Sequence, residues 1–327
     1  MSKWLCTLLS AGILSFAVSA HAQNYPTKAI TIVVTAAAGG VTDVVARALG
    51  QKLSEAWGQQ VIIENRGGGA HILGAAAVAN AAPDGHTLMV AEAGTYVINP
   101  TLYPKEKIPF DVDKAFAPIT GLVRIHHALI TSPSFPATSV RDIIEASKQK
   151  PNSITFGTAG IGSGPHVNIA RLQHVAGIQM VPVHYRGATP AMNDVAGGHT
   201  NMMLISVSSA LPSFRAGKVK MLGIGSAKRL PQVADVPTIA ESGNLPGFIA
   251  GTWFGLAAIG GTPPAVLKKI HAEVLKIVAD PAFRERFLEK QLYEPMTSSS
   301  EAFQAYIRSE MQNWAKVIRE QKLAIAH

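Results

Sequence analysis

The chain of 327 residues carries 29 basic and 21 acidic side chains, a formal net charge of +8 at pH 7, and a single cysteine, Cys6. One cysteine excludes a disulfide framework and a multi-cysteine metal site, and no basic run alternates with aromatic residues as nucleic-acid binding would favour. The excess positive charge leaves two interpretations open, which are attraction of anionic ligands or surfaces and an ordinary solvated basic face.

Residues 1–22 are typical of a secretory signal peptide. Lys3 supplies the positive start, Leu8–Val18 is the apolar core, and Ala20-His21-Ala22 fits the small-x-small cleavage rule. The apolar run is shorter than the roughly 20 residues that a membrane-spanning helix needs, which disfavours the alternative of a membrane anchor. We therefore expect an exported mature protein that begins near residue 23 and lacks cysteine.

Short β-branched segments alternate with helix-like segments along the rest of the chain. The predicted strands are Ile30–Thr35, Val61–Glu64, Thr87–Ala91, Ile154–Gly157, Met180–Val183, Asn201–Ser206 and Lys220–Gly225. The predicted helices are Asp43–Trp57, Gly74–Ala81, Val140–Lys150, Pro165–Ala176, Pro190–Ala196, Pro264–Ala279, Pro281–Lys290 and Ser300–Gln321. This alternation predicts an α/β fold with mostly parallel sheets flanked by helices. We expect two lobes, with Gly121–Thr131 and Leu245–Gly255 as connections and the C-terminal helices completing the first lobe.

Three strand-to-helix turns share one design, namely Ala36–Asp43, Gly157–His166 and Tyr185–Pro190. Free backbone N–H groups and the positive end of the helix dipole meet at a helix start and favour an anion. Ser163 and Thr189 are predicted to cap the second and third helices. Because ligands of open α/β sheets bind at the carboxyl ends of the strands, the turns predict one anion site in a cleft. Ordinary turn chemistry is the competing interpretation.

Four side chains near these turns are candidates for ligand contacts. Asp43 either stabilises the first helical turn through its dipole or orients a ligand hydroxyl or a water. His166 either partners a ligand carboxylate or packs at the helix end. Arg186 either forms a bidentate pair with a carboxylate or points to solvent, and Thr95 is predicted to line the cleft.

Catalytic signatures are absent from the sequence. It contains no H-E-x-x-H, G-x-S-x-G or Walker A motif, and we predict no catalytic residue, metal site or cofactor. A secreted α/β hydrolase is the alternative, because Ser163 and His166 stand three residues apart around a helix start.

Markers of one family are spread along nearly the whole mature chain. They include Gly39-Gly40-x-Thr42-Asp43, Ile98-Asn99-Pro100, Gly157-Thr158-Ala159-Gly160, His184-Tyr185-Arg186-Gly187 and Asp235-Val236-Pro237-Thr238. The chain thereby resembles the Bug family of extracytoplasmic solute receptors, which are the TctC-like substrate-binding proteins of tripartite tricarboxylate transporters.

The resemblance implies a type II-like, two-lobed periplasmic binding protein that is not an enzyme and closes on its ligand by hinge motion. The implied division is a signal peptide over 1–22, a first lobe of 23–124 plus 250–327 and a second lobe of 125–249. The implied ligand is a small organic acid, either a di- or tricarboxylate or an aromatic carboxylate. The residues that the resemblance implies at the ligand are Ala38, Gly39, Gly40, Thr42, Asp43, Ala159, Gly160, Ser163, His166, Arg186 and Thr189, and Thr95 joins them from its predicted place in the cleft. The implied partners are the permease subunits of such a transporter, with a sensor kinase as the partner if the receptor senses rather than transports, and we expect a monomer.

Several positions depart from the family pattern. The first loop lacks the usual prolines, and Val41 replaces a glycine before Thr42-Asp43. Asn201 and Ile205 stand where an aspartate pair is common, which argues against a ligand with a free ammonium group and favours a purely anionic or partly apolar acid. His126 and His127 replace apolar or small residues, and we expect them either at the ligand or on the hinge surface.

Overall fold

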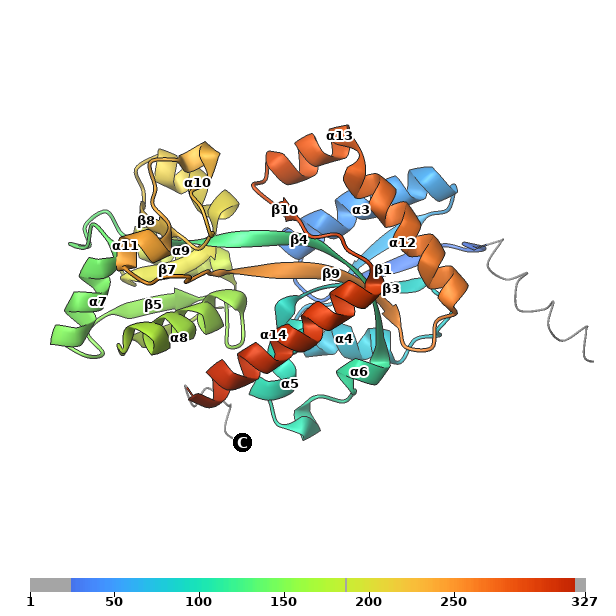
Figure 1. Ribbon diagram of the computed structural model, residues 1–327, viewed down its shortest axis with the longest axis horizontal. Coiled ribbons are helices and arrows are strands. Elements are labelled where there is room, and N and C mark those ends of the chain that lie inside the picture. The colour runs from blue at the N-terminus through green and yellow to red at the C-terminus, as the bar shows by residue number, and fades with distance from the viewer. Residues whose placement is uncertain (1–24, 186, 321–327) are drawn as a thin grey trace, which may run out of the picture.

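The computed structural model describes residues 25–185 and 187–320, which form a mixed α/β structure with two lobes (Figure 1). Each lobe is built on one sheet, and the two sheets share the long strand β4 (Phe116–Thr131). The predicted α/β class is confirmed. The predicted signal peptide lies outside the described residues.

The sheet of the first lobe has the strand order β2-β1-β3-β9-β4. These strands are β1 (Ile30–Val34), β2 (Val61–Asn65), β3 (Thr87–Glu92) and β9 (Gly251–Ile259), with the short β10 (Glu294–Pro295) pairing β4. β1 runs parallel to β2 and β3, whereas β9 runs antiparallel to both β3 and β4.

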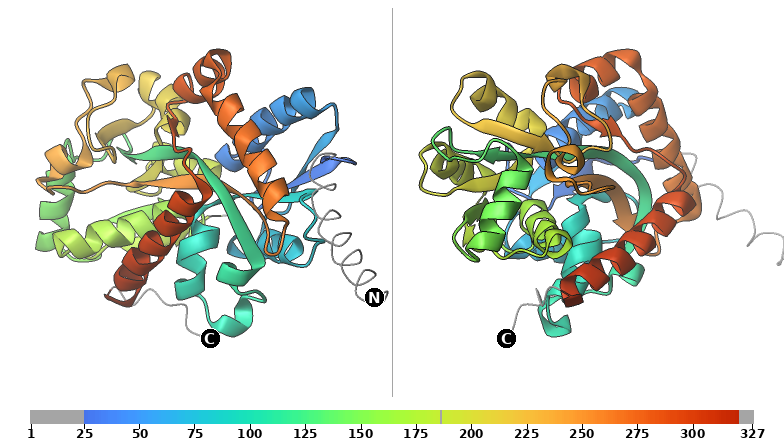
Figure 2. Two further views of the ribbon diagram at one scale, coloured as in Figure 1. Left: turned by 45° about the vertical axis from the view of Figure 1, so that its right-hand side comes forward. Right: turned by 60° about the vertical axis from the view of Figure 1, so that its left-hand side comes forward.

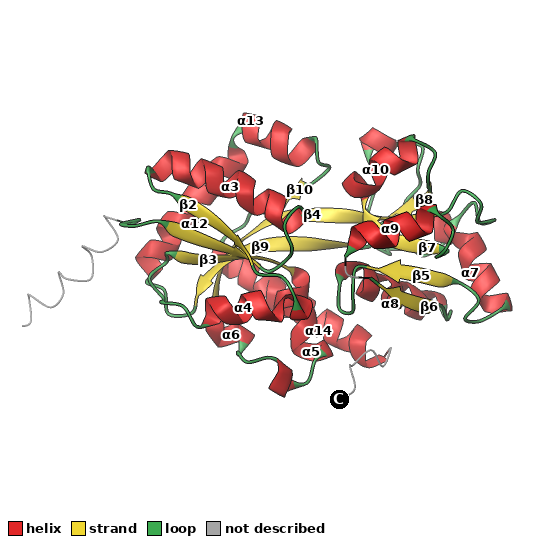
Figure 3. Cartoon of the chain, turned by 180° about the vertical axis from the view of Figure 1, so that it is seen from behind, coloured by secondary structure: helices red, strands yellow, loops and turns green. Residues whose placement is uncertain are grey.

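The sheet of the second lobe continues from the end of β4. It contains β5 (Thr155–Thr158), β6 (Val181–His184), β7 (Met202–Ser206) and β8 (Lys220–Ile224). β7 and β8 both pair antiparallel with β4, and β5 lies parallel to β6 and β7. Figure 3 shows β4 and β9 running side by side between the two lobes.

Helices cover both faces of each sheet (Figure 2). In the first lobe they are α3 (Val41–Trp57), α4 (Ile72–Ala79), α5 (Asn99–Leu102), α6 (Val112–Ala115), α12 (Pro264–Ala279), α13 (Pro281–Phe283) and α14 (Ser300–Glu320). In the second lobe they are α7 (Val140–Gln149), α8 (Gly164–Ala176), α9 (Ala188–Ala196), α10 (Val207–Arg215) and α11 (Ile239–Gly243). The 3₁₀ helices are η1 (Gly69–His71), η3 (Lys105–Lys107) and η4 (Pro231–Val233), and the π-helices are η2 (Gly94–Ile98) and η5 (Arg284–Glu289).

Burial of both faces explains why the central strands are almost continuously apolar. Along β1, Ile32 and Val34 point into a cluster beneath α3 and α12, while Val33 points into a second cluster beneath α4 and α14. In the second lobe, Leu204 and Met203 of β7 divide between two further clusters in the same way. Each sheet is therefore the middle layer of three.

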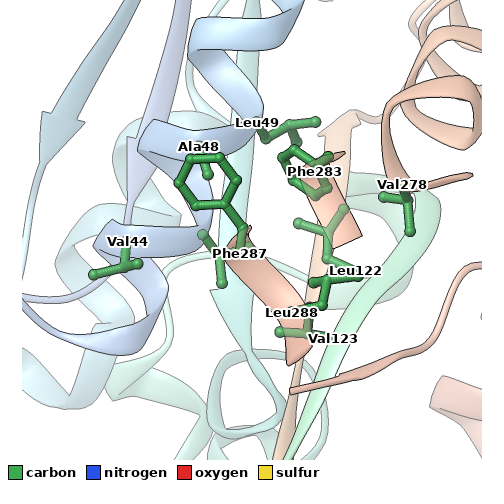
Figure 4. A pocket seen from close by; sticks show the side chains of 10 residues that line it. Val44, Ala48, Leu49, Leu122, Val123, Val278, Phe283, Phe287 and Leu288 are labelled. Atoms are coloured by element: carbon green, nitrogen blue, oxygen red, sulfur yellow. The ribbon is translucent and has the colours of Figure 1, made fainter. Parts of the chain in front are cut away.

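The C-terminal helices complete the first lobe, as predicted. Figure 4 shows Val44, Ala48 and Leu49 of α3 facing Phe283 and other apolar side chains from η5, α12 and β4. The remaining space between them is about 10 Å³, which is at most enough for one water molecule. This seam is a packing interface rather than a ligand site.

The elements differ from the expectations in two respects. The segments predicted to connect the lobes contain strands that were not expected, because Gly121–Thr131 lies within β4 and Gly251–Gly255 begins β9. α10 was missed because Pro212 interrupts its pattern, although it lies inside the helix. The lobe boundaries near residues 124 and 249 stay a proposal. No helix in the described part of the chain is long and apolar enough to span a membrane.

Candidate functional site

The β1–α3 loop presents the start of a long helix. Residues 37–40 are exposed, Gly40 is the N-cap, and the first intrahelical bond runs from the Val44 N–H to the Gly40 carbonyl. The N–H groups of Val41, Thr42 and Asp43 precede that bond and are therefore the donors of the helix start. The predicted geometry of a strand, a small-residue turn and a helix start is present.

Asp43 holds this loop together. Its carboxylate accepts hydrogen bonds from the Gly39 N–H at 2.9 Å, from Asn65 Nδ2 at 2.9 Å and from Arg47 Nε at 3.0 Å. Burial by itself raises the pKa of Asp43, but these bonds outweigh it and lower the pKa. The Gly39 N–H is thus used inside the loop, and Asp43 supports the helix start rather than standing free.

The β5–α8 loop satisfies most of its own donors. The Ser163 hydroxyl donates to the Gly160 carbonyl at 2.7 Å instead of capping the helix, although Ser163 occupies the N-cap position. The Gly160 N–H donates to Thr158 Oγ1 at 3.3 Å. The capping bond predicted for Ser163 is therefore wrong, because the tight turn brings a closer acceptor to the hydroxyl. Ala159 lies in the same turn, half-buried.

His166 faces its own loop. The Gly162 N–H donates to His166 Nδ1 at 3.2 Å, so that nitrogen is an acceptor and the ring is neutral. Burial, together with nearby His184 at 5.0 Å between ring centroids, lowers the pKa of His166 to about 4. Because Ser163 and His166 each bond elsewhere, they do not form the nucleophile–base pair that a hydrolase would need.

The third turn begins its helix earlier than predicted. α9 starts at Ala188 with Gly187 as its N-cap, so Thr189 lies exposed in the first turn and is not the cap. Arg186, which was predicted to contact the ligand, lies outside the described residues. Tyr185, just before it, uses its hydroxyl to bind Asp194 within the second lobe at 2.7 Å.

The two lobes meet where the β5–α8 loop lies against η2 and α5. A Cβ placed on Gly162 would lie 3.0 Å from Leu102 Cδ2 and 3.5 Å from Asn99 Oδ1, and the φ of 77° also favours glycine at this close approach. Thr95 lies at this junction, is 2% exposed, and its hydroxyl has no hydrogen-bond partner among the described residues. Its neighbour Tyr96 belongs to the core, stacked on Trp253 at 5.5 Å.

Sequence reasoning missed two polar residues at this junction, His71 and Glu92, whereas His127 was expected either at the ligand or on the hinge surface. His71 Nε2 lies 2.9 Å from Glu92 Oε1, and His71 Nδ1 lies 2.7 Å from the Thr35 carbonyl oxygen. The His127 ring packs against the start of α8, where a Cβ on Gly164 would lie 3.2 Å from His127 Cε1. Glu92 directly follows the apolar segment Thr87–Ala91, which was predicted to be a strand. A carboxylate in that position was the sequence signal that could have identified Glu92 as a candidate.

An open space between the lobes lies on the face of β4 and β9 that is opposite to His127. It measures about 560 Å³ and is lined by β4, β9 and β10, by α8 and α14, and by the loop at residues 226–230. His126 and Arg124 line it, both near the Glu294 carboxylate. No group of three or more potential metal-binding side chains occurs in the described residues.

Comparisons with known proteins agree with the sequence markers. The model of the tripartite tricarboxylate transporter family receptors, TctC, matches residues 45–323. The chain belongs to the TctC family. Family members are periplasmic solute-binding proteins, and the resemblance inferred from the sequence is confirmed.

Individual relatives match over most of their length. A UPF0065 protein encoded between tcbD and tcbE in Pseudomonas sp. (strain P51) is 35% identical over 300 residues, covering 91% of this chain and 88% of that protein. Rhodopseudomonas palustris Rpa4515 with adipate has a TM-score of 0.85 and 29% identity, covering 92% of this chain and 99% of that one. MatC from the same organism with bound malate has a TM-score of 0.80 and 31% identity, covering 90% and 100%.

Proposed function

We propose that this TctC-family protein captures a small organic acid between its lobes in the periplasm and delivers it to the membrane subunits of a tripartite tricarboxylate-type transporter. The observation that carries the proposal is that solved neighbours spanning at least nine-tenths of this chain hold adipate and malate. The helix start at Val41 and the loop contact between Gly162 and Asn99 favour the junction between the lobes as the place of capture.

The proposed anchor is the set of free N–H groups at the starts of α3 and α8. The first-turn donors of α3 lie beside an exposed loop, and α8 begins with Gly164 and Pro165. Proline lacks an N–H, so α8 offers Gly164 and His166 as its first donors. Donors at a helix start stabilise a carboxylate through hydrogen bonds and through the dipole.

A proline substitution tests this anchor without breaking the helix. Proline is well tolerated at the first helical position, and the extended conformation of the preceding Gly40 (φ −80°, ψ 172°) suits it. We expect Val41→Pro to remove one ligand donor and to weaken carboxylate binding about tenfold, since a hydrogen bond to a charged group contributes roughly 1.5 kcal/mol or more.

The matched control is Val112→Pro. Val112 is also a half-buried valine at the first position of a helix, after an extended Asp111, but it starts α6, which belongs to the first lobe alone. Calorimetric titration with adipate, malate and related acids measures both variants. If no carboxylate binds the wild type or raises its melting temperature, the proposal fails, because a ligand at 100 times its Kd stabilises the native state by about 2.7 kcal/mol.

A further inference from the structure

The junction between the lobes holds a largely buried ion pair, with side chains 20% and 14% exposed, that the proposed amide anchor leaves unused. The Thr35 carbonyl can only accept, so His71 Nδ1 carries a proton, and Nε2 then donates to Glu92 from a charged ring. Burial alone lowers the pKa of His71, but the Glu92 carboxylate outweighs it and raises the pKa. The pair is therefore neutral as a whole, and His71 occupies only one oxygen of Glu92.

The backbone is strained where it presents His71. Ala70 and His71 both adopt left-handed conformations, with φ of 52° and 74°, which cost of order 1 kcal/mol or more for residues other than glycine. Asn99 Nδ2 donates to the Ala70 carbonyl at 2.5 Å and helps to hold this conformation. Backbone strain of this kind persists where the surrounding structure holds the strained residues in place, and such residues cluster at functional sites.

Three neighbouring polar atoms are buried without partners among the described residues. They are Thr95 Oγ1, Asn99 Oδ1 and His127 Nδ1, on side chains that are 2%, 3% and 2% exposed. They come from η2, α5 and β4, and the last two face the β5–α8 loop at Gly162 and Gly164. An unpaired buried polar atom is costly, so a polar ligand that reached these three atoms would be stabilised by them.

We propose that Glu92 makes this site select carboxylates that carry a hydroxyl group, by accepting a hydrogen bond from that hydroxyl on the oxygen that His71 leaves free. This inference rests on the proposed function. The Glu92 side chain is 14% exposed, so its second oxygen is open to a donor, and a ligand without a hydroxyl forgoes that hydrogen bond. An ammonium group is disfavoured, because the charge of Glu92 is already balanced by His71 at 2.9 Å.

The test uses the wild-type protein and pairs of acids that differ by one hydroxyl: propionate and lactate, succinate and malate, glutarate and 2-hydroxyglutarate. Aspartate, the amino counterpart of malate, is added. We expect at least one hydroxyl acid to bind about tenfold or more tighter than its partner in calorimetric titration. Equal affinity within each pair, or tightest binding of aspartate, overturns the inference and leaves the proposed function intact. If no acid binds, both fall together.

The double variant His71→Gly with Glu92→Met locates the effect. Removing both partners avoids an unpaired buried charge, and glycine suits the φ of 74°. A cooperative melt shows that the variant is folded, and we expect its hydroxyl preference to fall to about twofold or less. The control is Glu320→Met, which breaks an exposed His–Glu pair of similar length, 3.0 Å, with His174. A folded double variant that keeps the wild-type preference overturns the inference.

Discussion

His126 and His127 are neighbours in the sequence but occupy opposite environments, because successive side chains of a strand point to opposite faces. His126 lines the 560 Å³ space beside α14, with Nε2 3.2 Å from Glu294. His127 points the other way, against the start of α8, and its Nδ1 has no partner among the described residues.

The two faces of β4 therefore handle polar groups differently. Beside α14, Arg124 and His126 both lie near the Glu294 carboxylate, which is 51% exposed, and burial lowers the pKa of His126. On the other face, Glu92 and His71 form a buried pair beside unpartnered Thr95 and His127. Buried polar atoms without partners among the described residues occur on both faces, since His126 Nδ1 and Trp253 Nε1 beside α14 also lack them. The faces differ in the exposure of their carboxylates, which is 14% for Glu92 and 51% for Glu294.

The largest expected effect comes from breaking the buried pair. His71→Ala leaves the Glu92 carboxylate buried without its partner, and we expect a loss of about 3 kcal/mol in the free energy of unfolding. Urea unfolding at pH 7 measures it. A loss below about 1 kcal/mol would mean that Glu92 is effectively solvated.

The next effect is a pH dependence on the same face. Burial lowers the pKa of His127 to about 4, against an ordinary value near 6.5. Between these values the unfolded chain binds more protons than the native state, so stability falls as the pH drops from about 6.5 towards 4.

From pH 7 to pH 5 the loss for one such histidine is about 2 kcal/mol. His166 adds a similar term, since its pKa is also about 4. We expect His127→Gln to be about 2 kcal/mol less sensitive to this pH change than the wild type. Identical pH profiles of unfolding would contradict the neutral, buried state of His127.

A smaller effect concerns the unpartnered hydroxyl of Thr95. Thr95→Val keeps the shape and removes the hydroxyl, so the empty protein should keep its stability within about 0.5 kcal/mol. If the hydroxyl contacts the bound acid, affinity falls about tenfold. The control is Thr131→Val, another buried threonine with an unpartnered hydroxyl, at the far end of β4 in the second lobe. Equal affinities of both variants would remove Thr95 from the site.

The smallest effect is expected behind β4. Glu294→Gln breaks an exposed pair, which typically contributes less than about 1 kcal/mol, and should leave carboxylate affinity unchanged. Urea unfolding and calorimetric titration check the two statements. A loss of unfolding free energy as large as that of His71→Ala would show that the two faces of β4 do not differ in this way.

Local signals were enough to predict many elements. β1 and β3 are apolar runs bounded by turn residues, and α13 starts where Asp280 precedes a proline, with the Asp280 carboxylate accepting from the Phe283 N–H. Such signals act within a few residues. β4 was not predicted as a strand, because Arg124 and the two histidines interrupt the apolar pattern that marks a buried strand.

The sequence by itself determined the α/β class, the small-residue turn before α3 and the family, since these rest on local patterns and ordered motifs. The tertiary structure alone decided that Asp43 is engaged within its own loop and that Glu92 meets His71 across 21 positions in the sequence. It also decided which of two adjacent histidines faces the junction. The physical reason is that hydrogen-bond partners and burial depend on how elements distant in the sequence pack together. The residues adjacent to a position in the sequence do not specify that packing.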